Sequence, residues 1–379
     1  MIVKLLEKLI SFVTGLTAML LVFNMNAGEA GNFNAIIPTP VQYEANQGVN
    51  NPNIVDHYVN LYANNVYHMS QQKGSNLMPF VSVEGLVRNA KQINRQGAMG
   101  DPHEYTGRGS NVVATNPPSD DRWVSAQRYW LATFVDSYDQ IRTLYDIRNA
   151  YAEAMAMSFG RLYDRVIIAA ALGTVFSGPN RKPVVLPYRQ KYVCRDDAGE
   201  FSGYNLRALM DVRWLMKKTF AIEKGGRIIS TITADESYSL LDEAKIQNRD
   251  FTNILVLMEG EVSYFYGSVF VETQLIPQSS EIVHYDKTTG RVAETAAKAS
   301  ATAGNRAQVA IGAANRCFAF TAGDALCFGI NQNTQFTVDR RPDKHNQIQL
   351  YYSAEFGATR KEEVKVVEIV SKHIPLPAV

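Results

Sequence analysis

The sequence is poor in cysteine and has almost no net charge. Its three cysteines, Cys194, Cys317 and Cys327, are an odd number in a chain of 379 residues, so they make no disulfide framework, and none of their spacings suits zinc. We therefore expect a reducing compartment. The 38 Lys and Arg residues balance the 37 Asp and Glu residues, for a net charge of +1. This balance argues against a dedicated nucleic-acid-binding protein, which has a basic excess, but not against a protein that encloses nucleic acid.

Motifs of the common enzyme classes are also missing. The sequence has no phosphate-cradling Gly-x-x-x-x-Gly-Lys-[Ser/Thr] loop, no Gly-x-Ser-x-Gly elbow and no His-Glu-x-x-His pair. Asp101, His103 and Glu104 lie close together, but no second His or carboxylate pair is spaced to complete a metal site, which favours a solvated loop. We therefore predict no catalytic residue, no cofactor-binding residue, no metal ligand and no cofactor, in a protein that is not an enzyme.

The densest basic cluster consists of Arg340, Arg341 and Lys344. It could touch a phosphate backbone, but a solvated loop or an ion pair between subunits is the better interpretation. Adjacent acidic residues such as Asp120 and Asp121 are typical of a solvated turn.

The first 30 residues allow three interpretations. Lys4 and Lys8 precede an apolar run from Leu9 to Phe23, as in a secretory signal. The same stretch places apolar side chains on one side of an amphipathic helix and polar ones on the other, and Glu7 suits a signal badly. Alternatively, translation starts at Met25.

The next segment, residues 24–80, is rich in Asn and Gln and nearly free of charge, with three prolines in its first half. This composition predicts either a long arm that lies on a neighbouring surface or a surface loop of the same domain. A helix is expected over 54–72. Residues 80–136 then predict two long β-strands, separated by a loop rich in glycine and proline.

The strongest local pattern predicts a long helix over 150–173. Apolar side chains fall at helical spacing, and Gly173 offers a stop. The stripe consists of Tyr151, Met155, Phe159, Leu162 and Val166. At about 1.5 Å per residue, this helix would be about 36 Å long.

After a connector over 179–204, the pattern changes to mixed α/β. It predicts a helix near 206–220, a strand over 227–233, and a short helix that Thr233 and Glu236 open as a capping box. Further elements are expected as follows: a strand over 254–258, two strands bent at Gly267, a long loop or insertion over 281–315, a hairpin over 317–330 around Gly323 and Asp324, and two final strands over 347–356 and 363–370 with a turn at 357–361.

Several segments, together with the order of the elements, resemble one family. They are NVYHMSQQKGSNL, DIRNAYAEAMAMSFGRLYDRVIIAAALGT, YNLRALMDVRWLMKK, EGEVSYFYGSVFVET and RCFAFTAGDALCFGI. They resemble the major capsid proteins of tailed phages, whose fold is named after phage Hong Kong 97. The resemblance spans residues from about 60 to 370, and the long-helix segment is its most specific part.

The resemblance implies an α+β fold of the Hong Kong 97 type. Its expected parts are an N-terminal helix and N-arm (1–79), an extended β-loop (80–136), a peripheral domain (137–204 and 341–379) with the spine helix 150–173 and strands around 137–148, and an α/β axial domain (205–340). Residues 1–24 have no place in the family pattern. Lys91 lies in the region where the eponymous phage crosslinks its shell, but nothing marks a partner Asn or a catalytic carboxylate, so crosslinking is not expected.

The resemblance also implies a function. It is that of a major capsid protein that self-assembles into the icosahedral shell around the double-stranded DNA of a tailed phage, located in the virion and assembled in the host cytoplasm. The implied partners are copies of the chain as pentamers and hexamers, scaffolding and portal proteins and a cement protein, with DNA enclosed without sequence-specific binding and no membrane. The alternatives are an encapsulin-like compartment shell protein, or an exported envelope protein or enzyme with an N-terminal signal.

Overall fold

The computed structural model describes residues 71–86, 90–104, 116–136, 147–223, 225–242, 264–279, 281–292 and 306–374. The expected N-terminal helix, the arm up to residue 70 and the strand over 254–258 lie outside these residues. Gln71 and Gln72, the last residues of the helix predicted over 54–72, are not helical.

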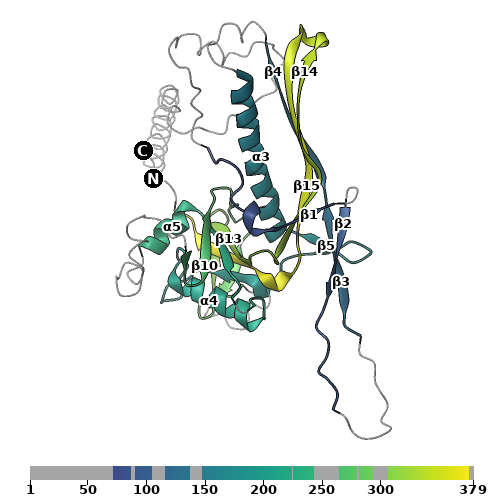
Figure 1. Ribbon diagram of the computed structural model, residues 1–379. Coiled ribbons are helices and arrows are strands. Elements are labelled where there is room, and N and C mark those ends of the chain that lie inside the picture. The colour runs from purple at the N-terminus through teal and green to yellow at the C-terminus, as the bar shows by residue number, and fades with distance from the viewer. Residues whose placement is uncertain are drawn as a thin grey trace, which may run out of the picture. The chain divides into compact units, whose positions relative to one another are not determined.

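A four-stranded sheet, here called the spine sheet, lies beside a long helix (Figure 1). The helix is α3 (Ile147–Leu172). In spatial order, the strands are β1 (Ser82–Gly85), β14 (Leu326–Arg341), β15 (Gln347–Arg360) and β4 (Gln127–Val135). β1 pairs with β14 in parallel, and the other pairs are antiparallel. The short helix η6 (Pro342–Lys344) connects β14 to β15.

A six-stranded sheet forms a second body of structure. Its strands, in spatial order, are β7 (Lys191–Val193), β16 (Val366–Lys372), β13 (Ala314–Thr321), β8 (Ile228–Ile232), β10 (Ser268–Glu272) and β9 (Tyr264–Phe265). Ile228 and Ile232 of β8 belong to a core with α4 (Leu206–Lys218), whereas Ile229 belongs to a core with α3. Because neighbouring side chains in a strand point to opposite faces, the sheet is covered on both sides. The short helix α5 (Ala234–Leu241) follows β8.

The described residues also form two smaller sheets. One is four-stranded, with β2 (Ala90–Gln96), β3 (Ser119–Ser125), β5 (Val175–Ser177) and β6 (Lys182–Val184) in that order. The other pairs β11 (Val283–Asp286) with β12 (Arg306–Val309). Three further short helices are η3 (Met78–Phe80), which precedes β1, η4 (Tyr188–Gln190), between β6 and β7, and η7 (Glu363–Lys365), between β15 and β16.

The long helix is confirmed, with its first residue three positions earlier than predicted and its last at Leu172, before Gly173. Its most buried apolar residues include Phe159, Ile167 and Ile168, each at most 3% exposed. Leu162 and Val166 of the predicted stripe are only partly buried, because the helix packs on the spine sheet with its first half and on the six-stranded sheet with its last turns.

Several local predictions are confirmed. Thr233 and Glu236 form the capping box that opens α5. The strand over 227–233 is β8, and the predicted helix near 206–220 is α4. The chain bends at Gly267, whose φ of 75° is in the left-handed region that favours glycine, and β9 and β10 pair across the bend.

The hairpin predicted over 317–330 is wrong. β13 and β14 are separate strands on either side of Gly323, but β13 pairs with β8 and β16, whereas β14 pairs with β1 and β15. The connection leads from one sheet to another. A Gly-Asp turn between two apolar strands occurs both in a hairpin and in a connection between two sheets. The turn does not encode which distant strand each of the two strands pairs with.

The turn predicted at 357–361 is also wrong for most of its length. β15 continues to Arg360, and the chain turns only at η7. A Cβ atom at Gly357 would lie 2.0 Å from the carbonyl oxygen of Ser125, so this glycine permits close packing of the backbone and makes no turn. β15 and β16 then belong to different sheets.

Three further stretches contain more structure than predicted, or a different kind. The connector over 179–204 contains β6, η4 and β7, and the loop predicted over 281–315 contains β11, β12 and the start of β13. Each long strand predicted within 80–136 is two shorter strands in two different sheets. Residues 147 and 148 are helical, so the strand predicted around 137–148 does not extend to its end, and its other residues lie outside the described ones.

Replacing Phe159 by Ala should destabilise the subunit by about 3–5 kcal/mol, because the ring is 2% exposed and lies 4.4 Å from the ring of Tyr352, centroid to centroid. Chemical denaturation measures the change in the free energy of unfolding. Arg165→Ala, on the exposed side of the same helix, is the control and should change it by no more than about 0.5 kcal/mol. Equal effects of the two variants would show that the contact between helix and sheet does not stabilise the subunit.

Candidate functional site at the base of the β2–β3 excursion

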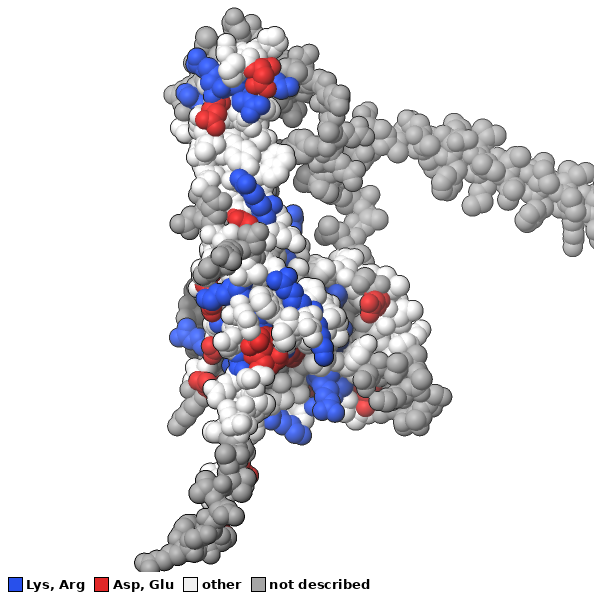
Figure 2. All heavy atoms as spheres, turned by 90° about the vertical axis from the view of Figure 1, so that its right-hand side faces the viewer, with Lys and Arg blue, Asp and Glu red and all other residues white. Residues whose placement is uncertain are grey.

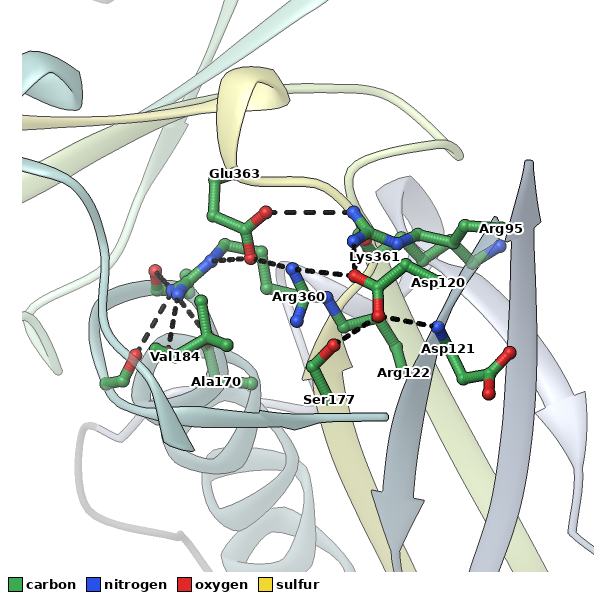
Figure 3. A network of polar contacts seen from close by, with 12 residues as sticks. Arg95, Asp120, Asp121, Arg122, Ala170, Ser177, Val184, Arg360, Lys361 and Glu363 are labelled. Carbon is green, nitrogen blue, oxygen red and sulfur yellow. Dashed lines mark hydrogen bonds and ion pairs between the residues drawn. The ribbon is translucent and has the colours of Figure 1, made fainter. Parts of the chain in front are cut away.

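A network of charged side chains joins the base of the β2–β3 excursion to the spine sheet (Figure 3). The excursion consists of β2, β3 and the residues between them. At the centre of the network is Glu363 of η7, whose Oε1 lies 2.5 Å from Nη2 of Arg122 and 3.9 Å from Nε of Arg360, and whose Oε2 lies 3.7 Å from Nη1 of Arg95. Arg122 is 3% exposed and Arg360 is fully buried. One carboxylate therefore bridges β2, β3 and the end of β15.

Asp120 of β3 is the second acid of this network. Its carboxylate accepts hydrogen bonds from the hydroxyl of Ser177 at 2.6 Å and the backbone N–H of Asp121 at 2.8 Å, and it pairs with Arg95. The Ser177 hydrogen bond, followed by the Arg95 guanidinium, lowers the pKa of Asp120 from 3.8 to about 2. The pair predicted as a solvated turn is thus part of a strand, and Asp120 fixes β3 to β2 and β5.

A second acidic bridge lies beside the first. Glu84 of β1 pairs with Nζ of Lys91 at 2.9 Å and with Nζ of Lys361 at 3.4 Å. The hydrogen bond from Lys91 is the main cause of a lowered pKa of Glu84. Lys91 thus forms an ion pair within its own chain.

Arg360 also joins the network to the end of α3. Its Nη1 donates to the carbonyl oxygens of Ala171 at 2.8 Å and Gly173 at 3.1 Å, and its Nη2 donates to that of Val184 at 3.4 Å. The last carbonyls of a helix have no partners within the helix and carry partial negative charge, so a buried guanidinium there is favourable. The base of the excursion, the end of the long helix and β6 therefore meet at one side chain.

The network positions the strands, because its carboxylates pair with arginines and with the Ser177 hydroxyl and so join β2, β3, β5 and the end of β15. Beyond it, the backbone N–H of Gly97 donates to the carbonyl oxygen of Pro118 at 2.6 Å, which closes the stem of the excursion. Residues 97–104 are all exposed. The geometry describes a projecting element with a rigid base.

A second polar site fixes the segment before η3 to α3. Asp164 is fully buried on the helix, and its carboxylate accepts hydrogen bonds from the backbone N–H groups of Asn76 and Leu77 at 3.0 and 3.1 Å and from the hydroxyl of Ser75 at 2.5 Å. Any residue larger than glycine at Gly160 would collide with the backbone of this segment at 2.5 Å. Residues 74–77 are therefore held at a fixed place on α3.

Exposed aromatic side chains lie on the face of the spine sheet that points away from α3. Trp130 and Phe134 of β4 are 65% and 39% exposed, and they alternate with Val135, which is buried against α3. Tyr351 of β15 stacks on Trp130 with ring centroids 6.3 Å apart. Figure 2 shows a largely uncharged band on this face, next to the charged end formed by β14 and β15. Among the described residues β4 is an edge strand of the sheet.

The residues considered as metal ligands lie on the excursion. Asp101, His103 and Glu104 are exposed, and no group of three or more His, Cys, Asp or Glu side chains among the described residues could hold a metal ion. At the tip of the β14–β15 hairpin, Arg341 pairs with Asp343 of its own chain at 2.9 Å. The basic cluster therefore contains an exposed ion pair within one subunit.

The sequence did not reveal Arg122, Arg360 or Glu363 as members of a site. Arg122 and Glu363 are 241 residues apart in the chain, and Arg360 is at the end of a strand with no motif around it. The available signal was Arg122 directly after Asp120 and Asp121 in a stretch with a β-strand pattern. This signal indicates a buried ion pair only when another part of the chain is known to pack on the strand.

The family model and the similar solved structures agree with each other. The family model for "Phage capsid protein" matches residues 54–372. Among solved structures, the capsid of cyanophage P-SCSP1u is similar, with a TM-score of 0.58, 16% identity, and 84% of this chain and 94% of that chain covered. The capsid of Ralstonia phage GP4 has a TM-score of 0.58 at 10% identity, with 84% and 96% covered. That of cyanophage Pam1 has a TM-score of 0.57 at 13% identity, with 89% and 99% covered. No curated protein matches the sequence.

These likenesses confirm the predicted fold class, an α+β fold of the Hong Kong 97 type. None of the helices in the described part of the chain is long and apolar enough to cross a membrane.

The network should make stability depend on pH in acid. Because the pKa of Asp120 is lowered to about 2, its contribution is complete above the ordinary value of 3.8 and is lost as the pH falls through about 2. Asp120→Asn should lower the melting temperature at neutral pH, and its deficit relative to the unmodified chain should shrink between pH 4 and 2. Asp101→Asn on the exposed part of the excursion is the control and should show no deficit at any pH. A deficit of Asp120→Asn that is the same at every pH would contradict the prediction.

Proposed function

The chain belongs to the phage capsid protein family, and on this premise we propose that it is the major capsid protein that forms the icosahedral shell of a tailed phage. The observation that carries the proposal is the family match over residues 54–372, on a chain with the Hong Kong 97-type fold. In this proposal, the chain self-assembles as pentamers and hexamers and encloses double-stranded DNA without reading its sequence. As a capsid protein it belongs to the virion, and assembly in the host cytoplasm is part of the proposal.

The parts of the subunit can be assigned to the proposed shell by their sheets. The excursion corresponds to the extended loop, α3 with the spine sheet to the peripheral domain, and the six-stranded sheet to the axial domain. β14, at 326–341, pairs within the spine sheet, and β16, at 366–372, pairs within the six-stranded sheet. We therefore draw the proposed domains by sheet, so that residues 326–341 join the peripheral domain, and residues 191–193 and 366–372 join the axial domain.

The proposed shell contacts use surfaces that one subunit cannot cover by itself. The exposed rings of Trp130 and Phe134 form one such surface, on a strand that is at the edge of the sheet among the described residues. The exposed part of the excursion forms another. A compact face buries only about 800 Å² per partner, and a projecting element adds contact area without enlarging the core. Weak contacts suffice, because each becomes effectively intramolecular once neighbouring subunits are placed.

Other partners also belong to the proposal. Scaffolding and portal proteins would act during assembly, and a cement protein would bind the finished shell. A structural role without enzymatic activity accords with the family. An encapsulin-like compartment would use the same fold, but the family match favours a phage shell. No specific observation favours an exported envelope protein or enzyme.

Sedimentation and electron microscopy of the purified full-length chain test this function. We expect closed particles or capsomers. Trp130→Asp should keep the subunit folded, because the ring is 65% exposed, but should block assembly by placing a charge in the apolar contact. Trp130→Phe is the matched control and should assemble. A chain that stays monomeric with scaffold present would contradict the function, whereas normal assembly of Trp130→Asp would contradict only this contact surface.

A second test removes the projecting part of the excursion. Residues 98–117 are deleted, and Gly97 is joined to Pro118 through an Asn-Gly turn, which the 2.6 Å hydrogen bond between these two residues permits. We expect an unchanged melting temperature and loss of assembly. Replacing 98–117 by a Gly/Ser segment of equal length distinguishes a need for its sequence from a need for its reach. Normal shells from the deleted chain would show that the excursion is not the extended loop of assembly.

A further inference from the structure

A basic groove opens between α4, the η4–β7 segment and the turns that follow β9 and β11. Its volume is about 650 Å³. Four of its lining residues are cationic and one is acidic. The cationic residues are Arg189, Lys191, Arg195 and Arg291, and the acidic residue is Asp211. Because the whole chain has a net charge of only +1, this is a local concentration of positive charge.

The negative charge in the groove is already neutralised. Asp211 accepts a hydrogen bond from the hydroxyl of Tyr192 at 2.8 Å and pairs with Nη2 of Arg195 at 3.3 Å. Among the residues that the structure describes, neither Arg189 nor Arg291 has a carboxylate within ion-pair distance. Their positive charge in the groove is not offset by any carboxylate among the described residues.

Lys191 adds to this surplus. It lies 3.5 Å from Glu368, whose other oxygen is 2.6 Å from Nε of Arg316. Because one carboxylate pairs with two cations, one positive charge remains without a matching negative charge beside the groove.

Aromatic side chains stand between the cations. Trp214 is 51% exposed, with Nζ of Lys218 4.8 Å and the guanidinium carbon of Arg291 5.3 Å from its ring centroid. Tyr266 is 47% exposed, and Arg213 lies over its ring. Guanidinium groups suit phosphate oxygens, because their N–H donors match two phosphate oxygens at once, and such contacts are the main term in sequence-independent duplex binding.

We propose that this groove binds the phosphate backbone of duplex DNA and is where the shell subunit contacts the enclosed genome. The inference rests on the proposed function and deepens it, because it assigns the DNA contact to one place and makes the exposed face of α4 the side turned towards the genome. Binding by phosphate contacts is independent of sequence and falls as salt rises, by counterion release.

The test measures fluorescence anisotropy of a labelled duplex of about 20 base pairs with the full-length, unassembled chain. The double variant Arg189→Gln with Arg291→Gln removes two cations from the groove. The control, Arg128→Gln with Lys344→Gln, removes two exposed cations elsewhere. Losing two phosphate contacts should make the slope of log K against log salt shallower by about 1.8 in the groove variant, so that its affinity changes about twelvefold less between about 50 and 200 mM salt. The control should keep the original slope.

Two results would overturn the inference. One is an equal change of slope in both double variants. The other is tight binding of polyglutamate with no binding of the duplex, which would identify an acidic polypeptide as the partner. Electron microscopy of the same preparations separates this inference from the proposed function. Shells that form normally, with duplex binding unaffected by the groove variant, would remove only the groove assignment, whereas absence of shells from the unmodified chain would remove the proposed function.

Discussion

The packing of α3 across two sheets is the contact on which the rest of the described subunit depends. Met155 and Phe159 pack on the spine sheet, and Ile167 and Ile168 reach the core shared with the six-stranded sheet. Each such side chain contributes roughly 1.5–3 kcal/mol by leaving water. Because one rigid helix carries both contacts, the spine sheet and the six-stranded sheet are held at a fixed distance. The apolar side of α3 is therefore ordinary core, and the functional surfaces lie elsewhere on the subunit.

The distribution of charge is a second constraint on the subunit. The chain is nearly neutral, so many copies can lie side by side without strong repulsion. Charged side chains gather instead at the base of the excursion, where Glu363 and the half-exposed Asp120 pair with three arginines, two of them buried. A buried ion pair of this kind fixes the orientation of the strands more than it raises the free energy of unfolding, because desolvation offsets much of the attraction between the charges. The uncharged aromatic face of the spine sheet and the basic groove beside α4 then supply two surfaces of different chemistry on one subunit.

The parts that the sequence predicted correctly are those with local signals. The long helix follows from apolar spacing and a terminal glycine, the start of α5 from Thr233 and Glu236, and the bend from Gly267. The family was evident from segments within these elements. The candidate site had no such signal, because Arg122 and Glu363 come together from positions 241 residues apart. Asp120 was mistaken for part of a solvated turn because the covering strand and Ser177 are distant in sequence.

By itself, the sequence determined the family, the α+β class and the positions of the three described α-helices, because capping, glycine conformation and side-chain periodicity act over a few residues. Only the tertiary structure decided which strands pair. β13 and β14 diverge into different sheets, and β15 continues through Gly357, because each position is set by what it packs against. The tertiary structure also decided that Arg360 is buried against the last carbonyl groups of α3. Burial and long-range pairing depend on the whole chain at once, and no short segment encodes them.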